Sequence, residues 1–324
     1  MAATRDSVAK KAGVSSATVS RVYNNPAQVS PVLASRVLEA AIALGYEPNS
    51  VAASLRRSGT GTLAFVQFKK ENRPYYWGNL ESFDWFYARA IRGMQEVLAQ
   101  SSWQMRFYTV GSAKDLEAVA KRCDGILAYD VDTKEEESYF SSISIPFVLA
   151  HHTSGLSVPY NTVRTDNVHG GRLQARHLRE SGCTKPLYIT GYLESVTPHA
   201  QRLAGFRELL PNVQVMDTLV GSPSQMDVTA RKVKSLIESK EIDGIAAVND
   251  VALFSLLMRY KPDLPSVGYD ASPLFSLYPV SVASIDIQSG ELYRRAALML
   301  LRLLSGVKTS SLTILPKLVQ PTAK

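Results

Sequence analysis

Cysteine and long apolar runs are scarce in this 324-residue chain. The two cysteines, Cys123 and Cys183, are too few and too far apart for a disulfide framework or a CxxC metal site, which agrees with a reducing compartment. No segment approaches the roughly 18 uninterrupted apolar residues that a membrane span needs. The first residues, MAATRDSVAKKAG, contain no apolar stretch typical of an export signal. We therefore expect a cytoplasmic protein that has no membrane partner.

Motifs of the common enzyme classes are also missing. The chain has no GxSxG nucleophile elbow, no GxxxxGK[ST] phosphate loop and no HExxH metal motif. Its five histidines offer little material for a metal cluster. The string GTGTLA at residues 59–64 satisfies GxGxxA, but it precedes an expected strand instead of following one, so we interpret it as a flexible connector. The sequence thus predicts no enzyme activity, no metal and no cofactor.

The composition is that of a folded, multi-domain protein with an uneven charge. Apolar residues make up 45% and charged residues 20% of the chain, close to the average of globular proteins, and the length exceeds that of one typical domain. Residues 1–58 contain seven Lys or Arg and three Asp or Glu, a net charge of +4 out of +7 for the whole chain. A basic head on a nearly neutral body favours a polyanion as the partner of the head, most simply nucleic acid.

Two of the three helices predicted in this basic head have clear start and stop signals. Residues 5–12 form an amphipathic stretch that Thr4 can cap and Gly13 can end. Ser30 and Pro31 occupy the cap and first positions of a later helix. The apolar stripe of that later helix should consist of Val32, Leu33, Val37, Leu38, Ala41 and Leu44.

The helix between them is predicted to face a polar partner. Ser15 can cap it, and Val19 and Val22 form its inward face. Its outward face is a poor surface for packing but is suited to the major groove of DNA, where hydroxyls reach phosphates and a guanidinium can pair with guanine. This outward face consists of Ser16, Ala17, Ser20 and Arg21.

The strings AGVSSATVSRVYN, VS and LGYEPNSVAASLR follow one another within residues 12–56. In this order they resemble the head of the lactose/galactose repressor (LacI/GalR) family of bacterial transcription regulators. The resemblance implies an all-α helix-turn-helix domain at residues 1–48, with a recognition helix over residues 16–22. It implies base-edge contacts from Ser16, Ala17 and Arg21. Phosphate contacts are implied for Thr4, Ser15, Thr18, Ser20 and Asn24.

The same resemblance implies a hinge helix and linker at residues 49–60, which becomes ordered when two copies meet on double-stranded DNA. Asn49, Ala52 and Leu55 would contact the DNA there, with Leu55 as an apolar wedge in the central base step. One head reads only a few base pairs, so we expect a homodimer on a pseudo-palindromic operator. The C-terminus ends at LVQPTAK without a leucine-heptad extension, which favours a dimer over a tetramer.

From about residue 61 onward, short apolar runs alternate with amphipathic stretches, as in Leu63 to Phe68 followed by Ala88 to Ala99. This alternation predicts parallel α/β layers whose strands are buried on both faces. Several strings here resemble the two-subdomain, periplasmic-binding-protein-like α/β core of the same family, so that the resemblance covers essentially the whole chain. They are CDGILAY, IPFV, VRTDNVHGGRLQARHL, YITG, RLAGFRE, GIAAVND, SVGYDAS and ELYRRAALMLLRLL.

The resemblance implies that residues 61–324 form an effector-binding and dimerisation core. Its first subdomain is expected at about 61–160 plus 290–311, and its second at about 161–289 plus the C-terminal tail. Three crossing segments would join them, near residue 160, near Ser289 and near Leu312. A small molecule would bind between the two subdomains.

Candidate effector residues lie where the strings align with the family. A carboxylate can accept sugar hydroxyls and an arginine can donate several N–H groups, and α/β sheets place ligands at the carboxyl ends of their strands. A network of ion pairs that merely joins the domains is the alternative, above all for the residue at 166. The resemblance implies effector contacts from Phe86, Tyr87, His151, Asp166, Arg202, Asn249 and Asp270.

Three features depart from a standard sugar site. His151 stands where sugar-binding members usually have aspartate, so a group that can donate, accept or titrate replaces an obligate acceptor. Pro223 stands where many members have an aromatic residue that stacks on a sugar ring. Residues 71–85 look like an insertion rich in Tyr and Trp, which either lines the ligand or packs on itself or on the dimer partner.

These features together predict an allosteric, homodimeric repressor of a carbohydrate-use operon, with a sugar or sugar derivative as effector. One alternative is a regulator of the same fold that responds to a purine or a sugar phosphate. A second alternative is a DNA-binding protein that keeps the core only for dimerisation. A solute-binding protein of a transporter is disfavoured, because it would need an export signal and no basic head.

Overall fold

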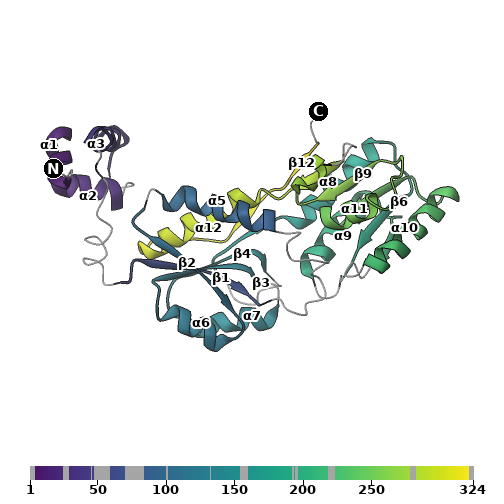
Figure 1. Ribbon diagram of the computed structural model, residues 1–324, viewed down its shortest axis with the longest axis horizontal. Helices are drawn as coiled ribbons and strands as arrows, with labels where there is room; N and C mark the ends of the chain where they lie inside the picture. Colours follow the sequence, from purple (N-terminus) through teal and green to yellow (C-terminus); the bar gives the residue numbers. More distant parts are fainter. Residues whose placement is uncertain are drawn as a thin grey trace.

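The computed structural model describes residues 4–24, 29–44, 46, 59–69, 84–99, 101–131, 133–153, 160–191, 193, 196–217, 223–277 and 282–320. Along the chain these residues form a helical head followed by two α/β subdomains, as the sequence predicts (Figure 1). The head contains α1 (Arg5–Ala12), α2 (Ser16–Asn24) and α3 (Pro31–Leu44).

The side chains predicted to cap the first two helices do so. Thr4 Oγ1 accepts the backbone N–H of Ser7 at 3.2 Å, and Ser7 Oγ accepts the N–H of Thr4 at 2.9 Å. Gly13 ends α1 at a φ of 61°, a left-handed conformation that glycine adopts without a steric penalty. Ser15 Oγ accepts the N–H of Thr18 at 3.1 Å. Each such N-cap stabilises its helix by about 1 kcal/mol, which matters in a small head with a marginal core.

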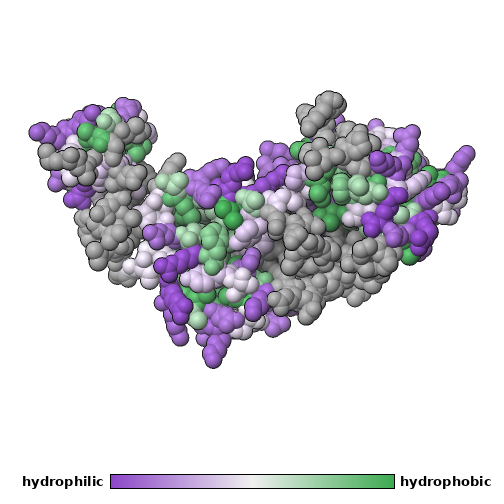
Figure 2. Space-filling view, viewed as in Figure 1, coloured by the Kyte–Doolittle hydropathy of each residue, from purple (hydrophilic) through white to green (hydrophobic). Residues whose placement is uncertain are grey.

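The apolar stripe predicted for α3 is only partly buried. Val37 and Ala41 lie in the core of the head together with Ala40, but Val32 is 82% exposed and Leu38 is 42% exposed. The prediction was wrong for Val32 and Leu38, because α1 and α2 cover only one side of α3 and bury a narrower stripe than the sequence pattern suggests. Hydrophobic surface is visible on the otherwise mainly hydrophilic head (Figure 2).

The first sheet has the strand order β11-β5-β4-β3-β1-β2, and all neighbouring strands are parallel. The second sheet has the order β12-β10-β9-β8-β6-β7, and only the edge strand β12 is antiparallel. The first contains β1 (Thr62–Phe68), β2 (Gln104–Val110), β3 (Gly125–Val131), β4 (Phe147–Thr153), β5 (Thr162–Thr165) and β11 (Leu312–Ile314). The second contains β6 (Pro186–Thr190), β7 (Gln214–Asp217), β8 (Gly244–Ala247), β9 (Ser266–Tyr269), β10 (Ala283–Asp286) and β12 (Lys317–Val319).

Helices cover both faces of the first sheet, because β1 presents apolar side chains on both of its faces. Leu63 and Phe65 pack toward α5 (Asp84–Leu98) and α12 (Ser289–Leu304). Ala64 packs in the opposite layer, and α5 with α12 lies across the sheet from this layer (Figure 1). That opposite layer contains α6 (Ala113–Ala120), α7 (Lys134–Ser138) and η3 (Tyr139–Ser142).

The helices of the second subdomain form two packed pairs. The first pair is α8 (Asn167–Glu180) with α9 (Thr197–Leu209), and the second is α10 (Pro223–Glu238) with α11 (Asp250–Leu257). The short η4 (Pro273–Leu277) follows β9 and packs beside α11. No helix in the described part of the chain has the length and apolar content needed to span a bilayer.

The chain changes sheet three times, after β5, after β10 and after β11. The second change lies between β10, which ends at Asp286, and α12, which begins at Ser289. The first change lies between β5 and β6, and the third lies between β11 and β12. The short strands β5 and β11 pair with each other at the edge of the first sheet. Two hydrogen bonds join the crossing segments: Asp166 N–H to the carbonyl of Ile314 at 3.0 Å, and Gln288 Nε2 to the carbonyl of Leu315 at 2.5 Å.

The helix pair of the first subdomain is in backbone contact at Gly93. A Cβ placed on this α5 residue would lie 2.0 Å from the carbonyl oxygen of Gly290 in α12, closer than real atoms approach. A Cβ on Gly290 would instead meet the nearest atom, the carbonyl oxygen of Arg89, at 3.6 Å, which is ordinary contact. The two glycines at one crossing therefore have different roles.

We expect Gly93→Ala to destabilise the protein by about 1 to 3 kcal/mol, because the new methyl group must push α5 and α12 apart. Gly290→Ala should change the free energy of unfolding by less than about 1 kcal/mol, with helix propensity acting in its favour. Urea unfolding followed by circular dichroism measures both. Equal stability of the two variants would contradict backbone contact at this crossing.

Candidate functional site

The first candidate site is the surface of α2. Val19 and Val22 are buried in the core of the head, so the opposite side of the helix faces away from it. The structure places four of the residues with predicted DNA contacts there: Ala17 and Arg21 are exposed, and Ser16 and Ser20 are half-buried.

Several hydroxyls of this surface also hold the head together. Ser16 Oγ donates to the carboxylate of Asp6 in α1, a contact between two helices that sequence reasoning missed. Ser15 Oγ and Thr18 Oγ1 are 2.9 Å apart and share a hydrogen bond. Both hydroxyls lie at the N-terminus of α2, where backbone N–H groups also favour an anion.

Four other candidates of the head are described only in part or not at all. Asn24 is the last residue of α2. Asn49, Ala52 and Leu55 lie outside the described residues, and their DNA contacts stay predictions.

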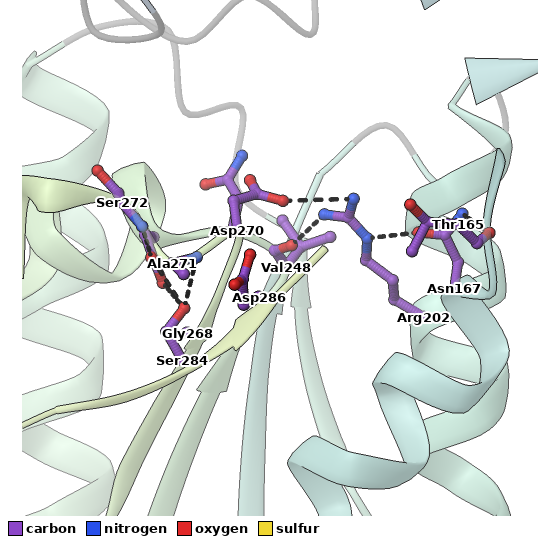
Figure 3. Close-up of polar contacts among 12 residues, drawn as sticks. Thr165, Asn167, Arg202, Val248, Gly268, Asp270, Ala271, Ser272, Ser284 and Asp286 are labelled. Carbon is purple, nitrogen blue, oxygen red and sulfur yellow. Dashed lines mark hydrogen bonds and ion pairs between the residues drawn. The ribbon is translucent and has the colours of Figure 1, made fainter. Parts of the chain in front are cut away.

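The second candidate site is centred on the buried guanidinium of Arg202 in α9, which is 3% exposed. Its Nη1 donates to the carbonyl of Val248 at 2.7 Å, and its Nε donates to Oδ1 of Asn167 at 3.1 Å. Its Nη2 lies 3.6 Å from Oδ1 of Asp270, and its Cζ lies 3.8 Å above the ring centroid of Tyr269. Figure 3 shows the guanidinium reaching three separate chain segments. A buried cation needs such partners, because desolvating an unpaired charge is costly.

Asp270 is held in a strained backbone at the carboxyl end of β9. Its φ is 98° and that of Ala271 is 51°, both in the region that favours glycine. Ser284 of β10 supports this turn, since its Oγ accepts the N–H of Ala271 at 3.0 Å. Strain of this kind is typical of sites where the surrounding structure fixes a functional side chain.

Asp250, the first residue of α11, lies beneath the strained turn and is 1% exposed. Its Oδ2 accepts the N–H of Ser272 at 2.6 Å, and both carboxyl oxygens lie 2.8 Å from Oγ of Ser284. Burial, reinforced by the negative charge of Asp270, raises the pKa of Asp250 well above its ordinary value. Sequence reasoning missed this residue, although the Asn-Asp pair after an apolar strand was the available signal.

Asp166 and Asn249 act as helix caps. Asp166 Oδ1 accepts the N–H of His169 at the start of α8, and Asn249 Oδ1 accepts the N–H of Ala252 at the start of α11, both at 2.9 Å. Both residues follow strands that end at the same edges of their sheets as the other candidates. Each cap therefore fixes a helix N-terminus beside the site.

A buried histidine lies one turn before Arg202. Nδ1 of His199 lies 2.8 Å from the carbonyl oxygen of Gly191. Burial, together with the positive charge of Arg202, lowers the pKa of His199 to about 3. The imidazole is therefore neutral near pH 7 and donates from Nδ1 to the carbonyl.

The candidates of the first subdomain form an aromatic group. The rings of Phe86 and His151 have centroids 4.9 Å apart, and His151 has a φ of 56° at the end of β4. Phe86 also meets Tyr129 edge-on at 6.1 Å. The ring centroid of Tyr87 lies 5.6 Å from that of Phe65 and 5.7 Å from that of Tyr129. Phe86 and His151 thus share one site, and Tyr129 contacts both Phe86 and Tyr87.

The seven effector candidates therefore fall into two groups. Phe86, Tyr87 and His151 belong to the first subdomain, and the other four to the second. The two groups come from elements that approach each other, since α9 lies next to β4. Pro223 begins α10, and the aromatic segment 71–83 lies outside the described residues. Among the described residues, no three His, Cys, Asp or Glu side chains form a group that could hold a metal ion.

Residues 5–49 match the family model described as bacterial regulatory proteins, lacI family. The ribose operon repressor of Halalkalibacterium halodurans is 28% identical over 86% of this chain and 83% of its own length. The sucrose operon repressor of Lactococcus lactis is 27% identical over 93% of both chains. The solved complex of the transcriptional regulator CelR with cellobiose is similar with a TM-score of 0.64, at 25% identity, over 99% of this chain and 100% of that one.

The buried carboxyl group of Asp250 leads to a pH-dependent prediction. The folded state binds its proton more tightly than the unfolded state, in which the pKa is near 3.8, so stability falls as the pH rises from about 4 through the folded pKa. Asp250→Asn keeps a neutral group of the same shape at every pH. We expect it to be more stable than the wild type by about 1 to 3 kcal/mol at pH 8, with a difference that shrinks toward pH 4.

Urea unfolding at several pH values measures this difference. Asp227→Asn is the control, because Asp227 is half-exposed in an ion pair with Arg259 and its loss should cost less than about 1 kcal/mol. A variant Asp250→Asn that is less stable than the wild type at pH 8 would show that the folded protein needs the ionised carboxylate.

Proposed function

Because the chain belongs to the lacI family of bacterial regulatory proteins, we propose that it is a repressor that binds a pseudo-palindromic operator as a homodimer. It acts in the cytoplasm on double-stranded DNA and is not an enzyme. A small molecule bound between the two subdomains of the core changes its affinity for the operator. The regulated genes serve carbohydrate use, by analogy with the ribose and sucrose operons for which two relatives are named.

The observation that carries this proposal is the surface of α2. Its apolar side is buried, while Ala17 and Arg21 are exposed beside half-buried serines. Small side chains let a helix enter the major groove closely, and the guanidinium of Arg21 can bind the edge of a guanine. The net charge of +4 in residues 1–58 adds attraction to phosphates.

The DNA contacts of the linker extend the proposal. Asn49, Ala52 and Leu55 bind at the centre of the operator, where the two copies meet. Leu55 unstacks a base step, at a cost of a few kcal/mol, and the resulting bend brings more of the protein into contact with the DNA. The half-sites are related by the two-fold axis of the dimer.

A neutral, hydroxyl-rich effector suits the group around Arg202. The guanidinium is 3% exposed and bound to Val248, Asn167 and Asp270, so it has little capacity left for an anionic ligand. The Asp270 carboxylate lies at the carboxyl end of β9, and a carboxylate at the end of a strand accepts sugar hydroxyls well. A sugar is therefore the effector that the second subdomain supports best.

The aromatic group of the first subdomain favours a second candidate. Phe86 and His151 offer ring faces and an imidazole instead of a carboxylate. Such a wall suits a ligand with a flat ring, such as a purine, or with an acidic group, such as a sugar phosphate. In either case the effector must bind one of two conformations of the core more tightly than the other. The difference between these two affinities sets the largest change in DNA binding that the effector can cause.

The role of Arg21 is tested on duplexes selected from random DNA by the wild-type protein. We expect a palindromic site, and Arg21→Ala should bind it about 10- to 100-fold more weakly and lose its preference at one base pair of each half-site. The control is Arg36→Ala, which removes an exposed arginine of α3 and should reduce affinity much less. Equal losses on the selected and a random duplex would contradict base reading by Arg21.

Effector binding is tested by thermal melting with ribose, sucrose and cellobiose. At least one sugar should raise the Tm of the wild type in a concentration-dependent way. Asp270→Asn should need at least about tenfold more sugar for the same rise, because it loses a charged acceptor, while Asp227→Asn should respond normally. If none of the three sugars acts, purines and sugar phosphates are the next probes. A normal response of Asp270→Asn would remove Asp270 from the site.

A further inference from the structure

The two subdomains share one arrangement of hydrogen bonds at the start of their central strands. The strings Asp-Gly-Ile at 124–126 and at 243–245 lead into β3 and β8. In each subdomain the Asp side chain reaches the neighbouring strand, β1 or β6, and binds the segment just before it. The segments begin alike, with a threonine two residues ahead of the strand: Thr60 before β1 and Thr184 before β6.

In the first subdomain the carboxylate of Asp124 binds the connector that follows the head. Its Oδ1 accepts the N–H of Thr60 at 2.9 Å, and its Oδ2 accepts the Thr60 hydroxyl at 2.9 Å and the N–H of Thr62 at 3.2 Å. The N–H of Asp124 donates in return to the carbonyl of Thr62 at 2.8 Å. Four hydrogen bonds therefore fix residues 60–62 to one side chain and its backbone.

The contact extends to Gly59. A Cβ on this residue would lie 2.3 Å from Oδ1 of Asp124, so only glycine allows the chain to approach the carboxylate this closely. The glycine that sequence reasoning assigned to a flexible connector is thus at a point of close contact. Residues 59–62 are therefore held in place by Asp124, and we call this set of contacts the clamp.

In the second subdomain Asp243 makes similar contacts within one domain, and it also accepts the Cys183 thiol at 2.9 Å. It accepts the N–H of Thr184 at 3.0 Å, the Thr184 hydroxyl at 2.7 Å and the N–H of Lys185 at 2.7 Å. The segment it holds joins α8 to β6, two elements that pack in the same core. The chemistry of the two clamps is therefore matched, but only the clamp of Asp124 holds the chain that comes from the DNA-binding head.

We propose that Asp124 is a positioning residue that couples the core to the heads by fixing the point at which the connector enters the first subdomain. The proposal rests on the proposed function, since it assumes two heads that bind one operator. Without the clamp, residues 59–61 of each copy lengthen the tether of the head, since β1 begins at Thr62. A longer tether lowers the effective concentration of the second head once the first has bound, and it adds segments that must be ordered on the DNA.

The clamp itself is tested by amide hydrogen exchange on the full chain without DNA. Asp124→Ala should speed exchange at Thr60 and Thr62 at least tenfold, because both N–H groups lose the carboxylate as acceptor. The second acceptor of the Thr62 N–H, Thr60 Oγ1 at 3.2 Å, is itself held by that carboxylate. Asp124→Asn should lie between the wild type and Asp124→Ala, since its amide keeps one acceptor oxygen. Asp243→Ala should leave Thr60 and Thr62 unchanged. Unchanged exchange at both threonines in Asp124→Ala would overturn the clamp.

The coupling is tested by binding to a selected palindromic duplex and to a duplex with one half-site. Asp124→Ala and Thr60→Val should weaken binding to the palindrome about tenfold and leave binding to the half-site within twofold. The matched controls Asp243→Ala and Thr184→Val remove the same contacts from the other subdomain, and they should change neither. Thermal melting shows whether all variants are folded.

The outcomes distinguish a failure of the proposed function from a failure of the coupling by Asp124. If the wild type binds palindrome and half-site duplexes no better than random DNA, the proposed function fails, and the exchange result alone decides the clamp. If the wild type prefers the palindrome but Asp124→Ala loses affinity for both duplexes equally, then Asp124 serves only the stability of the fold. The same conclusion holds if Asp124→Ala loses no more affinity for the palindrome than Asp243→Ala does. A selective loss on the palindrome, with partial recovery in Asp124→Asn, supports coupling.

Discussion

The buried guanidinium of Arg202 determines how the edge of the second sheet is built. A cation that is 3% exposed must have its donors and charge matched, and the matching groups come from the start of α8, the end of β8 and the end of β9. Asp270 reaches the guanidinium from a backbone conformation that residues other than glycine rarely adopt. The buried Asp250 and Ser284 support that turn from below, so one charge accounts for the placement of most polar groups at the site.

The two subdomains solve the same packing problems with the same means. Gly93 allows α5 to touch α12, and Gly171 and Gly205 allow α8 to touch α9, since a Cβ at any of the three would collide with the facing helix. Aspartates at 124 and 243 hold the chain before a central strand in each subdomain. The two subdomains differ at the candidate effector site. The first contributes an aromatic group with a histidine, and the second contributes the ion pair of Arg202 with Asp270.

Much of the fold could be predicted because its signals are local. Caps such as Thr4, the stop at Gly13 and the alternation of apolar runs depend on neighbours in sequence, and the structure confirms them. The exposure of Val32 and Leu38 could not be predicted, because an apolar pattern does not tell which other helices cover it.

The sequence by itself determined the three head helices, the outward residues of α2, the basic charge of the head and the α/β class of the core, since each follows from residue type and spacing. Only the tertiary structure decided that Asp250 lies under the turn of Asp270, that the ring of Phe86 packs on His151, and that Asp124 holds the connector. These contacts join residues far apart in the chain. Spacing along a sequence carries no record of such pairs, because burial and hydrogen-bond partners exist only once the sheets and helices have packed.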